Sequence, residues 1–148
     1  MPILNSISQM KEEMTKWRQD LHQIPELGFE EFKTSEFIEN KLKEWGVRHS
    51  TKIGKTGIVA QIIGTKGNSK ASIGLRADID ALPIEELNDF NYKSKNKGVS
   101  HKCGHDGHTS MLLGAVKYLS ENPNFNGVVN FIFQPAEEGL GGARVMIE

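Results

Sequence analysis

Apolar residues recur at helical spacing in the first third of the chain. Across residues 8–24 they fall at steps of 4, 3, 4 and 3, which places them on one face of a helix: Met10, Met14, Trp17, Leu21 and Ile24. Ser8 is a suitable N-cap for this helix, and Pro25 ends it. His22 lies near its end, where we expect it either at the surface or behind a site.

Two further helices are predicted by the same spacing. One covers residues 34–45 and is followed by Gly46, at the position where glycine often ends a helix. The other begins within residues 106–109 and reaches Ser120, with Asp106 as a suitable N-cap. Their apolar faces carry Ile38, Leu42 and Trp45 in the first, and Leu112, Ala115, Val116 and Leu119 in the second.

Between the helices the pattern changes to that of strands. Residues 57–64 predict one strand, because two alternating sets of side chains lie between two glycines: Ile58, Ala60 and Ile62, then Val59, Gln61 and Ile63. Apolar runs predict two more strands at 71–77 and 127–134, and Pro135 ends the second. Residues 65–70 are typical of a polar turn, and 88–97 are polar and irregular. At 148 residues, this mixture predicts one α/β domain.

The last residues, 141–148, resemble the opening turns of a helix with no stop signal. Val145, Met146 and Ile147 would expose apolar surface if nothing covered them. We therefore expect that these 148 residues are part of a longer chain; the alternative is a natural, frayed terminus.

Composition excludes several classes of function. Lys and Arg number 18 against 19 Asp and Glu, and this net charge of −1 gives no reason to expect nucleic acid or an anionic membrane as a partner. The N-terminus lacks the pattern of a secretory signal, and no apolar run approaches the ~18 residues of a membrane span. The one cysteine, Cys103, rules out an internal disulfide and suits a reducing compartment, so we expect a cytoplasmic location. No glycine-rich phosphate loop or serine nucleophile elbow is found.

Three polar clusters carry the candidate chemistry, and two of them follow directly on predicted strands. They are Asp78 with Asp80, the run from His101 through His105 to His108, and Glu137 with Glu138. Ligands of open α/β sheets bind outside the carboxyl ends of strands, so we expect the clusters to converge on one crevice. The Asp pair, preceded by Arg76, could orient a metal-bound histidine or supply a ligand; alternatively the two acids belong to an ordinary turn before Leu82.

The central cluster predicts a metal site. Cys103 and His105 flank Gly104, whose flexibility lets a thiolate and an imidazole face one point. This pair suits zinc and other borderline transition metals. The alternatives are a structural cysteine beside exposed histidines and a Cys–His nucleophilic pair. A structural zinc site is disfavoured because the chain has no second cysteine.

The acid pair after the last strand fits the same site. Adjacent carboxylates repel each other unless a cation stabilises them, and a metal bound by one would leave the other to act as general base toward water. Asp106 is a further carboxylate that could serve as a fourth ligand. The alternative for Glu137 and Glu138 is a solvated acid pair at the start of a helix.

Four sequence blocks resemble the metal-dependent N-acyl-amino-acid amidohydrolases, which include hippurate hydrolases, N-acetyl-diaminopimelate deacetylases and auxin-conjugate hydrolases, and which are related to the aminoacylase-like metallopeptidases. The blocks are residues 17–31, 74–83, 101–109 and 133–138. They run through the chain in order, and Lys102 stands where the family more often has alanine.

The resemblance implies roles and a fold. Cys103, His105 and Glu138 would bind a divalent metal, Zn or Mn with Co or Ni as alternatives, as one or two ions; Glu137 would be the general base. The fold would be the N-terminal part of a metallopeptidase-like α/β catalytic domain, with a central mixed sheet flanked by helices. The lid or dimerisation domain and further histidine ligands would lie outside residues 1–148, so this piece alone is expected to be inactive.

The expected function is hydrolysis of the amide bond of a small N-acyl amino acid, or a related conjugate, by a metal-activated water. The complete protein could form a homo-oligomer. Two alternatives stay open: a peptidase of the same superfamily, and a non-catalytic metal-binding domain.

Overall fold

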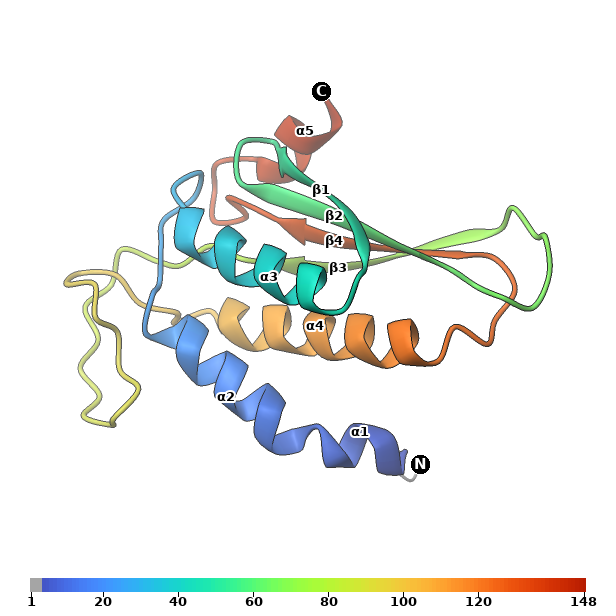
Figure 1. The fold of residues 1–148 in the computed structure, drawn as a ribbon. Coiled ribbons are helices and arrows are strands. Elements are labelled where there is room, and N and C mark those ends of the chain that lie inside the picture. Colours follow the sequence, from blue (N-terminus) through green and yellow to red (C-terminus); the bar gives the residue numbers. More distant parts are fainter. Residues whose placement is uncertain (1–3) are drawn as a thin grey trace.

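Four strands form one mixed sheet at the centre of the computed structural model, which describes residues 4–148 (Figure 1). They are β1 (Arg48–Ile53), β2 (Gly57–Ile63), β3 (Ser72–Asp78) and β4 (Val128–Gln134), in the spatial order β1-β2-β4-β3. β2 pairs antiparallel with β1 and β4, whereas β3 runs parallel to β4. The predicted α/β fold with a central mixed sheet flanked by helices is confirmed.

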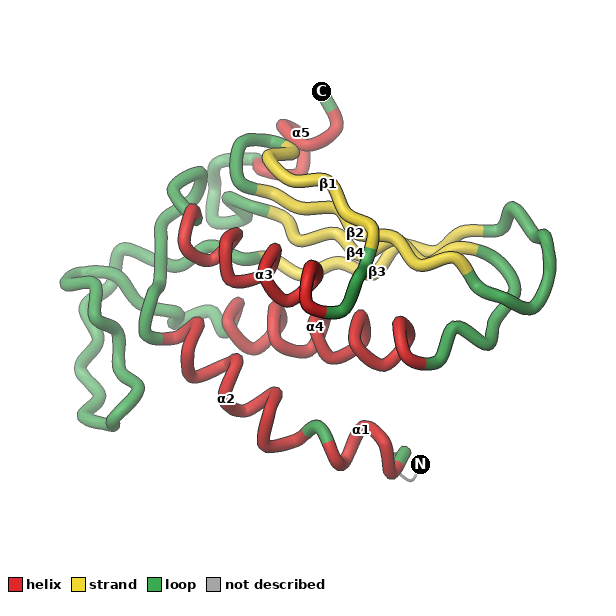
Figure 2. The backbone as a smooth tube through the Cα atoms, in the orientation of Figure 1, coloured by secondary structure: helices red, strands yellow, loops and turns green. Residues whose placement is uncertain are grey.

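Helices cover the sheet unequally (Figures 1 and 2). The helices α3 (Phe32–Glu44) and α4 (His105–Glu121) share one core with the sheet, and α2 (Lys11–His22) packs on α4. The short helix α1 (Asn5–Gln9) precedes α2, and α5 (Gly142–Ile147) lies beside β4. No helix within residues 4–148 has the length and hydrophobicity to cross a membrane.

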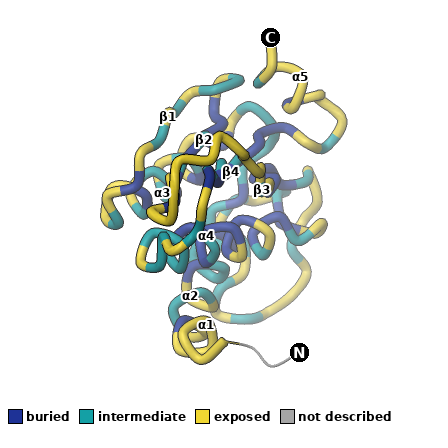
Figure 3. The backbone as a smooth tube through the Cα atoms, turned by 90° about the vertical axis from the view of Figure 1, so that its right-hand side faces the viewer, coloured by how far each residue is buried: buried dark blue, intermediate teal, exposed yellow. Residues whose placement is uncertain are grey.

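The alternation predicted for β2 decides which of its side chains enter the core. Ile58 and Ala60 are fully buried and lie opposite Phe133 and Phe131 of β4, which are also fully buried. The helix residues that meet them are those on the predicted apolar faces: Ile38, Leu42, Leu112 and Val116. Each such large side chain contributes about 1.5–3 kcal/mol by leaving water. Figure 3 shows buried backbone gathered between sheet and helices, with α1 and α5 largely exposed.

The predicted first helix is wrong in its N-terminal part. The chain forms two helices that meet at Met10, and Ser8 lies inside α1 with no capping bond, because the α1 cap is Leu4. Met10 is buried at this junction, and no glycine or proline marks the break. The burial of Met10 accompanies the break between α1 and α2, and the spacing of apolar residues in the sequence does not reveal this break.

The second predicted helix is confirmed with a small shift at its start. α3 begins at Phe32 rather than Thr34, and Gly46 follows with a φ of 65°. The Val47 N–H reaches the Leu42 carbonyl at 2.9 Å and the Gly46 N–H reaches the Lys43 carbonyl at 3.1 Å, which is the Schellman ending that such a glycine permits. The strands predicted at 57–64, 71–77 and 127–134 correspond to β2, β3 and β4 within one residue.

Strand β1 was not predicted from the sequence. Its residues, Arg48 to Ile53, are mostly polar because β1 is an edge strand with half-buried and exposed side chains in alternation. A bulge between Ser50 and Ile53 further obscures its period. The Gly54–Gly57 turn before β2 is the signal that could have indicated a hairpin.

Candidate metal centre

The chain enters α4 through a left-handed glycine. Gly104 has a φ of 85° and is the N-cap of α4, so Cys103 lies just before the helix and His105 in its first turn. No heavy atom outside the immediate chain would meet a Cβ at Gly104, so the requirement for glycine there is the backbone angle. Asp106, predicted as the N-cap, is instead the second helical residue, and the prediction that it caps α4 is wrong.

The parallel strands β3 and β4 end at one edge of the sheet, and this edge brings the acids to α4. Asp78 ends β3, and the chain continues through Asp80, whose Oδ2 accepts the Glu138 N–H at 2.9 Å. The three predicted clusters therefore lie together beyond the carboxyl ends of these strands, as open α/β sheets favour.

His105 is held in one orientation. Its Nδ1 lies 2.9 Å from the Asp80 carbonyl oxygen and 3.2 Å from Asp80 Oδ1. Burial disfavours the charged ring, but the bond to Asp80 and the charge of Asp78 outweigh this effect and raise the pKa of His105. With Nδ1 engaged, Nε2 is left to face the acids, an arrangement common for histidines that bind metals.

Cys103, His105 and Glu138 form a donor set: one ligand atom of each lies within 4.8 Å of the others. The His105 Nε2 is 3.7 Å from Glu138 Oε1. That oxygen is buried and finds no hydrogen-bond partner among the described residues. A buried carboxylate oxygen without a partner is costly, and a cation would satisfy it.

Electrostatics at Cys103 also favours a cation. The neighbouring carboxylate of Glu138, burial and the charges of other nearby acids raise the pKa of the Cys103 thiol, so the acids oppose a thiolate. A bound divalent ion reverses this balance by deprotonating a coordinating thiol. A thiolate, an imidazole and a carboxylate are ligands that suit a borderline transition metal, so the residues fit the metal that the sequence predicted.

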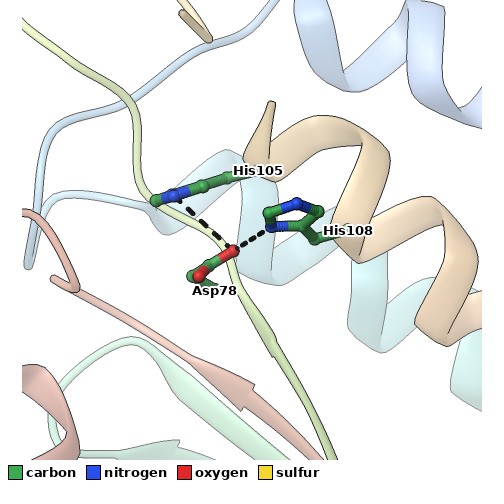
Figure 4. Close-up of side chains that lie close together, drawn as sticks. All are labelled: Asp78, His105 and His108. Carbon is green, nitrogen blue, oxygen red and sulfur yellow. Dashed lines mark hydrogen bonds and ion pairs between the residues drawn. The ribbon is translucent and has the colours of Figure 1, made fainter. Parts of the chain in front are cut away.

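A second group shares His105 with the first. Asp78, His105 and His108 also lie within 4.8 Å of one another by their ligand atoms, and Figure 4 shows Asp78 between the two histidines. Here Asp78 Oδ1 is 2.7 Å from His108 Nδ1, which is hydrogen-bond distance, and 3.6 Å from His105 Nε2. The other oxygen of Asp78 accepts from Arg76 at 2.8 Å. Asp78 thus orients His108 in this geometry.

Glu137 lies beside the donor set and outside it. Its side chain is 42% exposed, and its Oε2 is 4.0 Å from His105 Nε2. A solvent-accessible carboxylate at this distance can accept a proton from a water molecule between it and the donor set.

Asp106 faces away from the donor set, and the prediction that it could be a fourth ligand finds no support in its contacts. Its Oδ2 is 2.8 Å from Arg18 Nε and 2.7 Å from His22 Nδ1. His22 also bonds Glu86 at 2.7 Å through Nε2. These bonds tie α2, α4 and the 82–102 loop together behind the donor set.

His22 was left with two alternatives by the sequence, and it is buried with 3% exposure, which removes the surface alternative. Its hydrogen bond to Asp106 outweighs burial and raises the pKa of His22. Glu86 was not singled out from the sequence. Burial opposes its charge, but bonds from Lys102 and His22 lower its pKa to about 2. The sequence around Glu86 has neither helical nor strand periodicity, so it did not mark this residue as part of a site.

The comparisons with known proteins give the family. Residues 74–148 match the sequence profile of peptidase family M20/M25/M40, which is half of the chain and contains all three clusters. This chain belongs to peptidase family M20/M25/M40.

Relatives within this family extend the match to the whole chain. The hippurate hydrolase of Campylobacter jejuni is 52% identical over 148 residues, which are 100% of this chain and 38% of that protein. The N-acyl-L-amino acid amidohydrolase of Geobacillus stearothermophilus is 43% identical over 144 residues, 96% of this chain and 38% of that protein. This M20 chain therefore spans about two-fifths of the length of these curated relatives.

A solved structure matches the fold of this M20 chain closely. It is a Bacillus subtilis protein described as a dinuclear metal binding peptidase from the M20 family, with a TM-score of 0.88 and 39% identity. The match covers 95% of this chain and 39% of that one. The likeness to this metal-binding protein agrees with the donor set described above.

Proposed function

We propose that these residues are the N-terminal part of the catalytic domain of a metal-dependent amidohydrolase that cleaves the amide bond of small N-acyl amino acids. The observation that carries the proposal is the donor set of Cys103, His105 and Glu138, with the buried, unpartnered Glu138 Oε1 in it. The names of the relatives, hippurate hydrolase and N-acyl-L-amino acid amidohydrolase, support the substrate class.

In the proposed site, Cys103, His105 and Glu138 hold a divalent metal, Zn or Mn with Co or Ni as alternatives, as one or two ions. Such an ion would polarise the acyl carbonyl and lower the pKa of a water molecule toward ~7. The remaining work belongs to the chain. Asp80 fixes His105 Nδ1, and Glu137 accepts the proton of the attacking water at its carboxylate and delivers it to the leaving amine.

The second candidate is a peptidase, favoured by the description of the B. subtilis neighbour. The two activities differ in the acyl group that is bonded to the nitrogen of the scissile amide. In an N-acyl amino acid this is a plain acyl group, whereas in a dipeptide it is an aminoacyl group with a free amine. The choice therefore depends on substrate and leaves the assignments of Cys103, His105, Glu137 and Glu138 unchanged.

The test is a substrate panel with the complete protein that carries these residues. N-benzoylglycine, N-acetyl amino acids and unblocked dipeptides are compared, with metal removed by a chelator and then restored. We expect hydrolysis of the N-acyl substrates that stops with the chelator and returns with metal. Hydrolysis of dipeptides alone would move the assignment to a peptidase, and binding of metal without turnover of any substrate would leave a non-catalytic domain.

We also propose a cytoplasmic location, because the free and exposed Cys103 must stay reduced to bind a metal. The complete protein could form a homo-oligomer around a domain outside residues 1–148, and its partner in catalysis is the small substrate alone.

A further inference from the structure

Glu31 is a fully buried carboxylate far from the donor set in sequence. It belongs to the first family block, residues 17–31, in which the sequence analysis assigned no catalytic or metal-binding residue, and it is the N-cap residue of α3 with 0% exposure. Its Oε1 accepts the Ala136 N–H at 2.8 Å, and its Oε2 accepts the Thr56 hydroxyl. Within residues 4–148 it forms no ion pair, and burial raises its pKa. A buried acid without a cation is retained at a cost, which calls for a reason.

The reason lies in the backbone conformation of Ala136, whose N–H donates to Glu31. Ala136 has a φ of 50°, a left-handed conformation that residues with a Cβ rarely adopt, and it immediately precedes Glu137. Such a conformation persists only where the surroundings support it. The Gly142 N–H bonds the Ala136 carbonyl at 3.0 Å, and a Cβ on Gly28 would lie 3.0 Å from the Ala136 Cα, so the backbone at Gly28 closely approaches this turn.

The turn is fixed at both ends by buried carboxylates. Glu31 accepts the N–H before Glu137, and Asp80, which is 1% exposed, accepts the N–H of Glu138. The N–H groups of Ala136 and Glu138, which flank Glu137 in the chain, are therefore bonded to two different parts of the chain. Asp80 also orients His105, whereas the hydrogen bonds of the Glu31 carboxylate go to Thr56 and Ala136, neither of which is a donor residue.

We propose that Glu31 is a positioning residue: by holding the Ala136 N–H it keeps the left-handed turn that aims Glu138 at the donor set and Glu137 at the water beside it. The part of this inference that concerns turnover rests on the proposed function. The part that concerns metal affinity depends only on the donor set.

The test compares side chains of similar size in the complete protein. Glu31→Gln keeps an oxygen that can accept the Ala136 N–H, whereas Glu31→Met fills the same space without an acceptor. We expect Glu31→Met to weaken zinc affinity, measured by competition with a chelator, by about 10–100-fold. We expect its kcat at saturating zinc to fall by up to about 10²-fold with little change in KM. In Glu31→Gln, zinc affinity and kcat should both stay within about threefold of the wild-type values.

Glu26 provides the matched control. Its carboxylate accepts the Lys33 N–H at 3.1 Å and the Thr34 N–H at 2.9 Å at the same end of α3, and it has no bond to the Ala136 turn. Glu26→Met should therefore lower thermal stability without changing zinc affinity or kcat in the folded protein. A loss common to both methionine variants would assign Glu31 to stability alone and overturn the proposal.

Further outcomes are decisive as well. Equal zinc affinity in the wild type and folded Glu31→Met would contradict the proposal. If Glu31→Met does not fold, Glu31→Asp, which is one methylene too short to reach Ala136, takes its place with the same expectation. Failure of both variants to fold would make Glu31 a residue of general stability. If the wild type binds zinc but hydrolyses no N-acyl amino acid, the proposed function fails while the affinity measurement still decides the role of Glu31.

Discussion

At the scale of residues, the adjacent glutamates Glu137 and Glu138 lie in different environments. Glu138 places a buried oxygen without a partner beside His105, and Glu137 is more exposed at 42%. The sequence predicted that these two acids, Cys103 and His105 belong to one site, because their clusters follow strand ends and a glycine. It could not predict which atom of His105 is held by Asp80, since that depends on contacts between segments 25 residues apart.

Replacement of Glu137 by Gln should abolish turnover and leave metal bound. The amide keeps the shape of the side chain but cannot accept a proton, so we expect kcat to fall by about 10²–10⁴-fold. The measurement is kcat together with metal content in the complete protein, with Glu121→Gln at the exposed end of α4 as the control. A near-wild-type kcat in Glu137→Gln would require another base.

At the scale of elements, hydrophobic periodicity predicted the helices and strands whose apolar faces pack in the core. β2, β4, α3 and α4 carry clear apolar faces, and their bounds were predicted within a few residues. β1 was missed because an edge strand does not need apolar side chains on either face. The break at Met10 was missed because no residue that disfavours helices stands there.

The entry into α4 should depend on one glycine and not on its neighbour. Gly104 has a φ of 85°, so Gly104→Ala should destabilise the protein by about 1–2 kcal/mol and weaken metal affinity. Gly107 is helical, and nothing within 4 Å would meet its Cβ, so Gly107→Ala should stabilise by up to about 1 kcal/mol. Urea unfolding of the metal-free protein gives both values, and an equal effect of the two substitutions would refute this reading of the loop.

The link between α2 and α4 should depend on pH. Because Asp106 raises the pKa of His22 above 6.5, protonated His22 contributes stability that is fully present below about pH 6.5 and is lost as the pH rises through the raised value. We expect the stability difference between the wild type and His22→Gln to shrink from pH 6 to 9 in urea unfolding of metal-free protein. The control is His49→Gln, which removes a bond to the Val47 carbonyl only. A difference that stays constant across this range would argue against a charged His22.

At the scale of the molecule, the fold brings Asp78 and Glu138 from two separate segments to His105 on a third. The convergence was predictable because β3 and β4 were expected to end at the polar clusters. A place behind the site was one of two alternatives for His22, whereas its bonds to Asp106 and Glu86 were not predictable, since these residues share no period. Apolar side chains also remain exposed on these elements, among them Ile73 at 57% and Met111 at 60%.

Residues 1–148 alone should show no measurable hydrolysis and only weak metal binding. The Cys103 set supplies three donors, which suffice for one poor site, whereas a dinuclear centre needs more. Relatives are also more than twice as long as this chain, which matches 38% of their length. The measurement is hydrolysis of N-acetyl and N-benzoyl amino acids by this piece with added zinc, manganese, cobalt or nickel. Turnover that a chelator abolishes and metal restores would show a complete active site within these residues.

The central claim is that Cys103, His105 and Glu138 bind the metal, and zinc affinity of the complete protein tests it most directly. Competition with a chelator is measured for the wild type, Cys103→Ser, His105→Ala and Glu138→Gln, with His49→Ala as the control outside the site. We predict that each of the three site variants binds zinc at least about tenfold more weakly while the control is unchanged. Wild-type zinc affinity in all three site variants would contradict the account.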